Sequence, residues 1–228
     1  MVELTAAFDE GAGLSMQASL STRENHGVPY LMGAARFSRR VGEVEIANSG
    51  QPFGNFWEEM RDCATACVLM SDAAIESYAN ELFSDAEKIF PPEFVAGLDL
   101  LKADVEKKNV FEKLDLVLVL RGRDKLDRGS SSFQAVKMLG LLRNELTHFK
   151  PEWSHKKQRH LVVSEKLRGL FTLNPWFGRE GAFPSAWVSH SCTIWAVTSA
   201  IKFLQEFEDL ADLPGRTPWP AFQDRLIP

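Results

Sequence analysis

A continuous apolar stripe from about Asn55 to Ser84 constrains the fold more than any other feature of the chain. Its members recur at intervals of three and four residues, the spacing of one face of an α-helix, and neither Gly nor Pro interrupts it. The stripe consists of Phe56, Met60, Cys63, Cys67, Met70, Ala74, Tyr78 and Leu82. We therefore expect one long amphipathic helix here, around which the rest of the domain packs.

The other periodic segments predict further helices, so the fold class is expected to be all-α. We expect helices over about 30–41, 94–108, 109–121, 131–150, 158–173 and 189–212. The stretch LDLVLVL within 109–121 also fits a buried strand, but its helical flanks favour a helix. Pro151 is expected to end the helix before it, because a residue that precedes proline disfavours helical geometry. Gln158 begins the next helix, and a Pro-rich tail follows the last one.

The N-terminal region is expected to differ from this helical part. Residues 1 to about 28 are rich in Gly, Ser, Ala and Thr, which predicts an irregular arm. Glu43 to Ile46 alternates polar and apolar residues, a pattern that also fits a short strand. We therefore divide the chain into residues 1–54, an arm with a short helix and a small β element, and residues 55–228, a helical domain.

Composition restricts the classes of partner and the compartment. The 228 residues are 45% hydrophobic and carry a net charge of −5, so the whole molecule does not attract nucleic acid or an anionic membrane. Three cysteines do not form a disulfide framework, and we expect Cys63 and Cys67 in the core. No signal peptide and no apolar run long enough to span a membrane is seen, which predicts a cytoplasmic protein.

The stretch Leu142 to Pro151 carries the least explained polar residues. On a helical wheel, Asn144 and His148 lie within about 40° of each other, on roughly the opposite side from the apolar residues. Arg143 lies at the margin of the apolar side, where its stem can cover the core while its guanidinium reaches outward. Gly140 precedes Asn144 by one turn. This face is typical of a surface that contacts a second subunit or a ligand.

A structural explanation of the same residues remains open. A histidine near a helix end can simply be solvated, or can interact with the last carbonyl groups. Arg143 can pair with a carboxylate such as Glu76. Asp72, Glu76 and Asn80 form a polar line on the long helix, either as a solvated face or as hydrogen-bond partners for Arg143 and its neighbours.

The sequence RNELTH resembles the R-N-x-x-x-H motif of the HEPN superfamily (higher eukaryotes and prokaryotes nucleotide-binding domain). Arg143, Asn144 and His148 occupy the three motif positions. AIESYANELF, residues 74–83, is similar to the long helix of uncharacterised bacterial HEPN-like proteins. The resemblance covers roughly residues 55–210 and implies a HEPN-like helical bundle that dimerises, so that two motifs share one cleft.

The resemblance also implies an activity, that of a metal-independent endoribonuclease of toxin–antitoxin or phage-defence systems. In that scheme His148 transfers protons, Arg143 holds the phosphate, and Asn144 orients either the histidine or the phosphate. Glu76 and Asn80 are the expected supporting partners. No cofactor and no metal is expected, which agrees with the absence of a ligand cluster in the sequence. A homodimer, an RNA substrate and an antitoxin or defence-system partner are the implied partners.

A local excess of positive charge beside the motif is an independent indication of a polyanionic ligand. Residues 143–168 contain seven Lys or Arg against three Glu. The expected RNA contacts are Lys150, Trp153, Lys156, Lys157 and Arg159, with Trp153 stacking on a base. A solvated basic surface is the competing explanation.

Two other functions fit the same sequence. A non-catalytic HEPN-like dimeric module would bind a nucleotide or a protein partner. Alternatively, the motif face would serve only as a dimer interface.

Overall fold

The computed structural model describes residues 23–153, 155–156, 158–177 and 181–228. These residues form helices and no strand, so the all-α prediction is confirmed. The expected arm over residues 1–22 lies outside the described residues. None of the described helices has both the length and the apolar content that a membrane-spanning helix needs.

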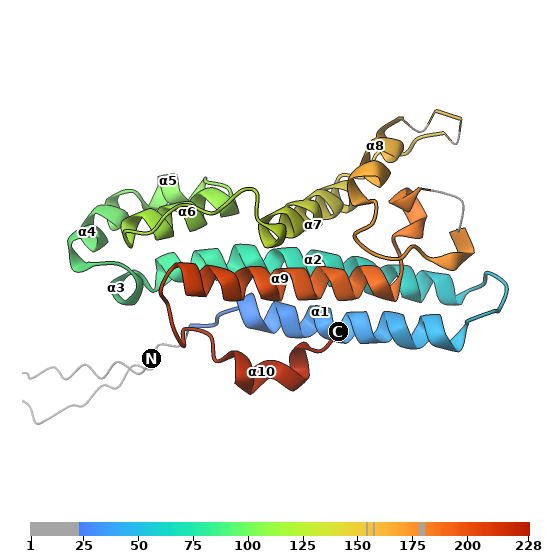
Figure 1. Cartoon of the computed structure of the whole chain (residues 1–228), viewed down its shortest axis with the longest axis horizontal. Helices are drawn as coiled ribbons and strands as arrows, with labels where there is room; N and C mark the ends of the chain where they lie inside the picture. Colours follow the sequence, from blue (N-terminus) through green and yellow to red (C-terminus); the bar gives the residue numbers. More distant parts are fainter. Residues whose placement is uncertain (1–22, 154, 157, 178–180) are drawn as a thin grey trace, which may run out of the picture.

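The predicted long helix is α2 (Phe56–Ser84), 29 residues without a break. Its apolar stripe is buried or partly buried between its neighbours, and Met60, Cys67 and Leu82 are fully inaccessible to solvent. Glu58 and Glu59 in its first turn interact favourably with the N-terminal end of the helix dipole. The helix runs almost the whole length of the molecule, as Figure 1 shows.

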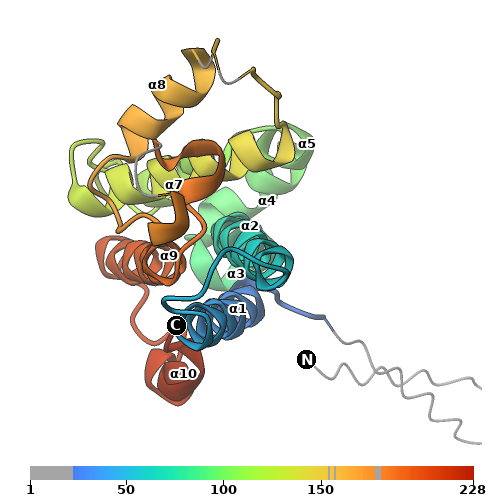
Figure 2. The ribbon, with the colours of Figure 1, turned by 90° about the vertical axis from the view of Figure 1, so that its right-hand side faces the viewer.

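Two further long helices, α1 (Gly27–Ala47) and α9 (His190–Leu210), pack along α2. In Figure 2 the three are seen end-on as neighbours, with α7 on one side and α10 on the other. Ser38 of α1 donates a buried hydrogen bond to Thr193 of α9 at 2.8 Å. The side chains of α1 belong to the same core as those of α2, so the two helices fold as one unit.

Two predictions for the N-terminal region were wrong. The helix predicted over about 30–41 has 21 residues, and Glu43 to Ile46 belongs to it rather than to a strand. Val44 is buried one turn after Val41, while Ile46 is largely exposed. The segment is therefore helical despite its short polar–apolar alternation. A helix buries Val41 and Val44 together on the face that packs against α2.

The middle of the chain forms four helices, of which α3 follows the end of α2 and the other three lie on one side of α2 (Figure 1). These are α3 (Ala86–Ile89), α4 (Pro92–Leu100), α5 (Lys102–Glu106) and α6 (Val110–Leu120). The segment LDLVLVL is helical as predicted, whereas the single helix expected over 94–108 is divided into α4 and α5. Asn109 and Glu112 form a reciprocal capping box, which satisfies backbone N–H groups at the start of α6.

The helix that carries the motif is α7 (Ser131–Thr147), which packs against α2 and α9. Ser130 caps it by accepting a hydrogen bond from the N–H of Phe133 at 3.2 Å. After it, α8 (Gln158–Leu167) ends six residues earlier than predicted. Gly169 follows with φ of +76°, a conformation that ends a helix and that glycine adopts without strain.

The C-terminal tail contains a helix that was not predicted, α10 (Trp219–Leu226). A buried carboxylate, Glu208 of α9, fixes this tail by accepting hydrogen bonds from Tyr78, Thr217 and Trp219. Short helical turns at Pro175–Phe177 and Ala182–Ala186 connect α8 to α9.

Candidate functional site

The motif residues lie at the C-terminal end of α7 and just beyond it. Arg143 and Asn144 are in the last helical turn, and His148 is the C-cap residue, with φ of −116° and ψ of 41°. The N–H of His148 still donates to the carbonyl of Asn144 at 2.9 Å. Asn144 and His148 are both exposed, as the wheel predicted. The helix ends at Thr147, three residues before Lys150, where the sequence predicted its last residue.

Arg143 is held by two neighbours. Its Nε donates to Oδ2 of Asp72 at 2.7 Å, and its Nη1 donates to Oδ1 of Asn144 at 2.6 Å. Its side chain is 37% exposed and that of Asp72 is 17% exposed. The guanidinium therefore has a fixed orientation while one face stays accessible to solvent, and Nη2 makes no hydrogen bond to another described residue.

Of the two side chains in this ion pair, that of Asp72 is the more buried. Burial raises the pKa of Asp72, and the positive charge and hydrogen bond of Arg143 offset only part of that shift. A Cβ atom on Gly140 would lie 3.4 Å from Oδ1 of Asp72. Gly140 therefore faces α2 of the same chain, and a second subunit is not needed to explain a glycine at this position.

Glu76 and Asn80 do not support the motif, contrary to the prediction. Both side chains accept hydrogen bonds from Nζ of Lys113 on α6, at 2.7 and 2.9 Å. Asp72 alone of the polar line contacts Arg143. The line on α2 is thus not one network, because Asp72 binds Arg143 of α7, whereas the more exposed Glu76 and Asn80 bind Lys113 of α6.

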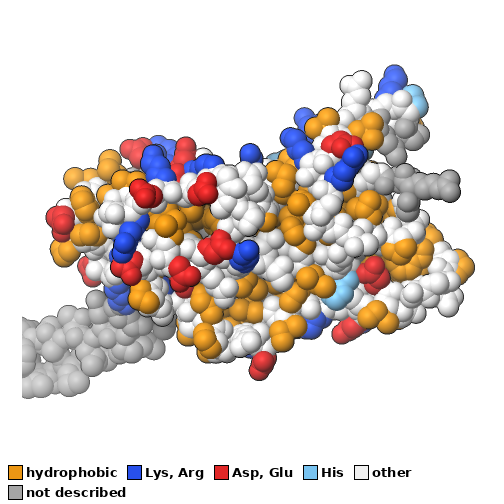
Figure 3. Space-filling view, viewed as in Figure 1, with side chains coloured by type: hydrophobic (Ala, Val, Ile, Leu, Met, Phe, Trp, Pro, Cys, Tyr) orange, Lys and Arg blue, Asp and Glu red, His pale blue; other side chains and the backbone are white. Residues whose placement is uncertain are grey.

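The basic window beside the motif is partly neutralised inside the protein. Arg159 donates to both carboxylate oxygens of Glu145, at 2.8 and 2.9 Å, and this pair joins α8 to α7. Glu145 is itself part of RNELTH but is buried. Arg159 therefore has an internal partner and is not a free RNA contact. Figure 3 shows basic side chains over α8 with an acidic group among them.

The remaining predicted contacts are more accessible. Lys150 and Lys156 are exposed, and Trp153 is 77% exposed. Lys157 lies outside the described residues. Lys150, Trp153 and Lys156 lie in the segment that joins α7 to α8, as His148 does.

One of the nearby histidines is structural. His160 is buried, and its Nε2 lies 3.0 Å from the carbonyl of Lys150, to which it must donate. Its ring packs against those of Phe149 and Phe183. The backbone N–H groups of His160 and Arg159 donate to Glu152 and lower the pKa of this carboxyl. His160 therefore fixes the loop between α7 and α8.

Sequence reasoning missed two buried charged residues, Lys113 on α6 and Glu145 on α7. Lys113 is 4% exposed although it lies within an apolar run, and Glu145 is buried three residues after Leu142. Their helical positions indicated burial, since both fall on the apolar side of their helices. A charged residue on such a side predicts a partner, but the sequence does not identify it.

The chemistry available at the motif is phosphate binding by Arg143 and proton transfer by His148. In the described part of the chain, no three His, Cys, Asp or Glu side chains are grouped as metal ligands. Comparison of the chain with protein-family models, curated proteins and solved structures found no match.

Proposed function

We propose that this protein is a metal-independent endoribonuclease of the HEPN type that acts as a homodimer. The observation that carries the proposal is the arrangement of Arg143, which Asp72 and Asn144 orient while His148 stays exposed at the helix end. An oriented cation and an exposed imidazole near the same helix end are suited to a phosphodiester.

The proposed reaction is an internal transfer at phosphorus. The ribose 2′-hydroxyl loses its proton and forms a bond to the adjacent phosphorus, and the bond from phosphorus to the 5′-oxygen breaks. The leaving oxygen takes up a proton, so the products carry a 2′,3′-cyclic phosphate and a 5′-hydroxyl. His148 transfers one of these protons, and Arg143 neutralises charge on the phosphate oxygens.

A second copy of the chain would complete this site. One imidazole cannot serve both proton transfers at once, and His148 of a second subunit would provide the other. Asn144, His148 and Phe149 are exposed together at the end of α7, which leaves this surface available for such a contact. Lys150, Lys156 and Trp153 would then flank the shared cleft and contact the RNA. We place the protein in toxin–antitoxin or phage-defence systems of the cytoplasm, with an antitoxin or defence protein as its partner.

One observation favours a second candidate, a non-catalytic HEPN-like module that binds a nucleotide or a protein. The ion pair with Asp72 neutralises part of the charge of Arg143. In that case the motif arginine would chiefly join α7 to α2, and RNA would remain intact.

Labelled RNA incubated with the purified protein in EDTA distinguishes the two functions. We expect products with 2′,3′-cyclic phosphate ends, and we expect Arg143→Ala and His148→Ala to abolish them. Arg61→Ala and His26→Ala are matched controls, because both side chains are half exposed and contact only nearby residues. Intact RNA with the wild-type dimer, or equal cleavage by His148→Ala, would refute the proposal. Sedimentation of each variant gives its oligomeric state.

A further inference from the structure

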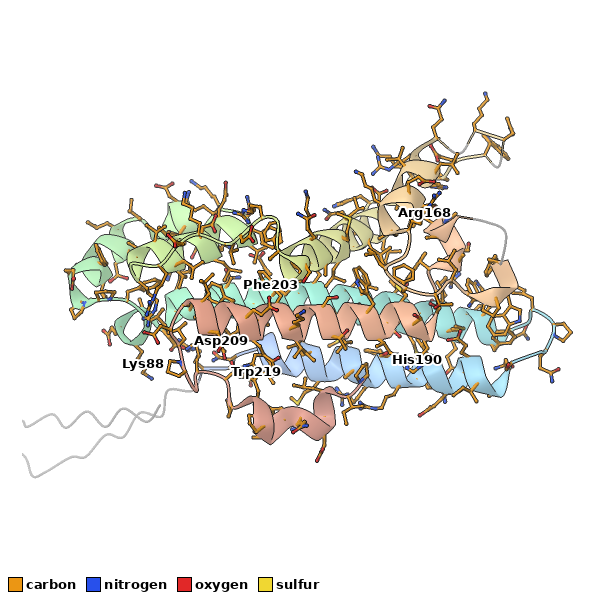
Figure 4. The ribbon with its side chains drawn as sticks, in the orientation of Figure 1. Lys88, Arg168, His190, Phe203, Asp209 and Trp219 are labelled. Carbon is orange, nitrogen blue, oxygen red and sulfur yellow. The ribbon has the colours of Figure 1, made fainter. Side chains whose placement is uncertain are left out.

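A cavity in the described part of the protein lies between α2 and the helices α3–α6, and its wall includes Glu76, one helical turn from Asp72. Its volume is about 790 Å³, within the range of small-molecule sites. Apolar walls come from Phe83, Val95, Leu98 and Val105. Lys88, labelled in Figure 4, lies on the α3 side, and the polar wall is formed by Glu76, Asn80 and Lys113.

Lys113 and Glu76 line this cavity and together supply one donor group and two acceptor atoms, which we call the polar row. The Lys113 side chain is 5% exposed, and its Nζ contacts Oε1 of Glu76 at 2.7 Å. An ammonium group has three N–H donors, and Glu76 and Asn80 take two of them. The Glu76 side chain is 46% exposed, and its Oε2 has no partner among the described residues. One donor, Nζ, therefore stands next to two acceptors, Oε1 and Oε2.

We propose that this cavity binds a guanine base through its Watson–Crick edge. That edge carries an acceptor, O6, followed by two donors, N1–H and the 2-amino group, which is the complement of the row formed by Lys113 and Glu76. O6 would accept from Nζ, while N1–H and the 2-amino group would donate to the two oxygens of Glu76. Charge-assisted hydrogen bonds of this kind are among the stronger polar contacts in proteins.

The other bases do not match this row. Adenine and cytosine place an amino group where O6 of guanine lies, and this donor would face the ammonium of Lys113. Uracil has a carbonyl group at the third position, which would face Oε2 of Glu76. Each mismatch leaves a buried or partly buried polar group without a partner, which binding sites strongly disfavour.

The remaining cavity walls suit a base rather than a phosphate. Phe83 and Leu98 offer apolar surface against which a purine ring can lie. The Arg23 side chain is paired with Asp85, as Lys113 is with Glu76. The other charged wall residues are two basic and three acidic ones, namely Lys88, Lys102, Glu87, Asp99 and Glu106. Figure 3 shows this mixture of signs over α3–α6, which gives no net attraction for an anion.

The site would lie beside the motif, because Glu76 is one helical turn from Asp72 on α2. The proposal nevertheless does not depend on RNA cleavage. The guanine could come from a free nucleoside or from a base in RNA, and the contacts with Lys113 and Glu76 would be the same.

Isothermal titration with guanosine, inosine and adenosine tests the base contacts. Inosine lacks only the 2-amino group, and we expect it to bind about 10- to 100-fold more weakly than guanosine, the effect of one charge-assisted hydrogen bond. Adenosine should show no binding. Equal affinity for guanosine and adenosine, or no heat with guanosine up to its solubility limit, would overturn the proposal.

Two variants locate the site. Glu76→Gln replaces an acceptor oxygen by a donor and should abolish guanosine binding, whereas Glu106→Gln, a change of the same kind on the exposed cavity wall, should not affect it. Leu98→Trp should block the cavity without touching the polar row, and it serves if Glu76→Gln fails to fold. Binding that survives both Glu76→Gln and Leu98→Trp would refute this location.

A short oligoadenylate with a single internal guanosine separates the two sources of the base. Tighter binding of this RNA than of guanosine, with the same loss in Glu76→Gln, assigns the site to RNA. Binding of guanosine alone assigns it to the free nucleoside. These binding results do not depend on whether the protein cleaves RNA. The proposed guanine site and the proposed endoribonuclease activity can therefore fail independently.

Discussion

Replacing Lys113 with Met should leave the free energy of unfolding within about 1 kcal/mol of the wild-type value, although the residue is buried and ion-paired. Met keeps the apolar stem and removes an ammonium group whose dehydration opposes folding. Exchange of a buried ion pair for apolar groups of similar size is often neutral or stabilising. Glu76 would lose its partner, but its side chain is 46% exposed and water can solvate it.

Two further variants are compared with Lys113→Met. Lys113→Ala should cost about 2–4 kcal/mol, because it also empties space among α2 and α6. Glu76→Gln should cost about 1 kcal/mol, since the buried ammonium keeps neutral acceptors while the exposure of Glu76 screens the original attraction. Urea denaturation followed by circular dichroism measures all three. Lys202→Met is the matched control, because Lys202 is 60% exposed and pairs with Glu206 on the surface of α9.

The reasoning would be refuted if Lys113→Met were as destabilising as Lys113→Ala. That result would mean that the attraction between Lys113 and Glu76 exceeds the cost of removing the ammonium from water. An unchanged dependence of the unfolding free energy on urea concentration is needed for the comparison, because it shows that the extent of unfolding is the same in each variant.

Two other predictions concern buried or anchored groups. Burial raises the pKa of the Cys67 thiol to about 12 and raises the pKa of the Cys192 thiol well above its usual value. Neither thiol should therefore react with a thiol reagent at pH 8 until the protein is unfolded. Rapid labelling of either thiol in the native protein would contradict its placement in the core. Burial acts to raise the pKa of Asp85, but hydrogen bonds from two arginine side chains outweigh it and lower the pKa below its usual 3.8. The stabilising contribution of Asp85 is therefore present above about pH 4 and is lost as the pH falls through the lowered pKa. Asp85→Asn should reduce the free energy of unfolding at neutral pH and make that free energy fall less steeply below pH 4. Urea titrations at several pH values measure this, and parallel pH dependences for the two proteins would contradict it.

Local pattern was sufficient wherever a long run of residues repeated at helical spacing. The stripe from Phe56 to Leu82 determined α2, and the serines before Phe133 determined where α7 begins. Short patterns were not sufficient. Four alternating residues suggested a strand within α1, and the proline content of the tail concealed α10, whose Trp219, Phe222 and Leu226 are spaced as one helix face. Burial against neighbouring helices decided both cases.

The sequence by itself placed Arg143, Asn144 and His148 within six residues of one another near one helix end, whatever the fold. It also indicated that the asparagine and the histidine face outward. The partners of these residues were decided only by the tertiary structure. Asp72 rather than Glu76 orients Arg143, and Glu145 takes the charge of Arg159. The physical reason is that a charge pair forms where two helices cross, and the rotation and offset of one helix against another depend on the packing of the whole core.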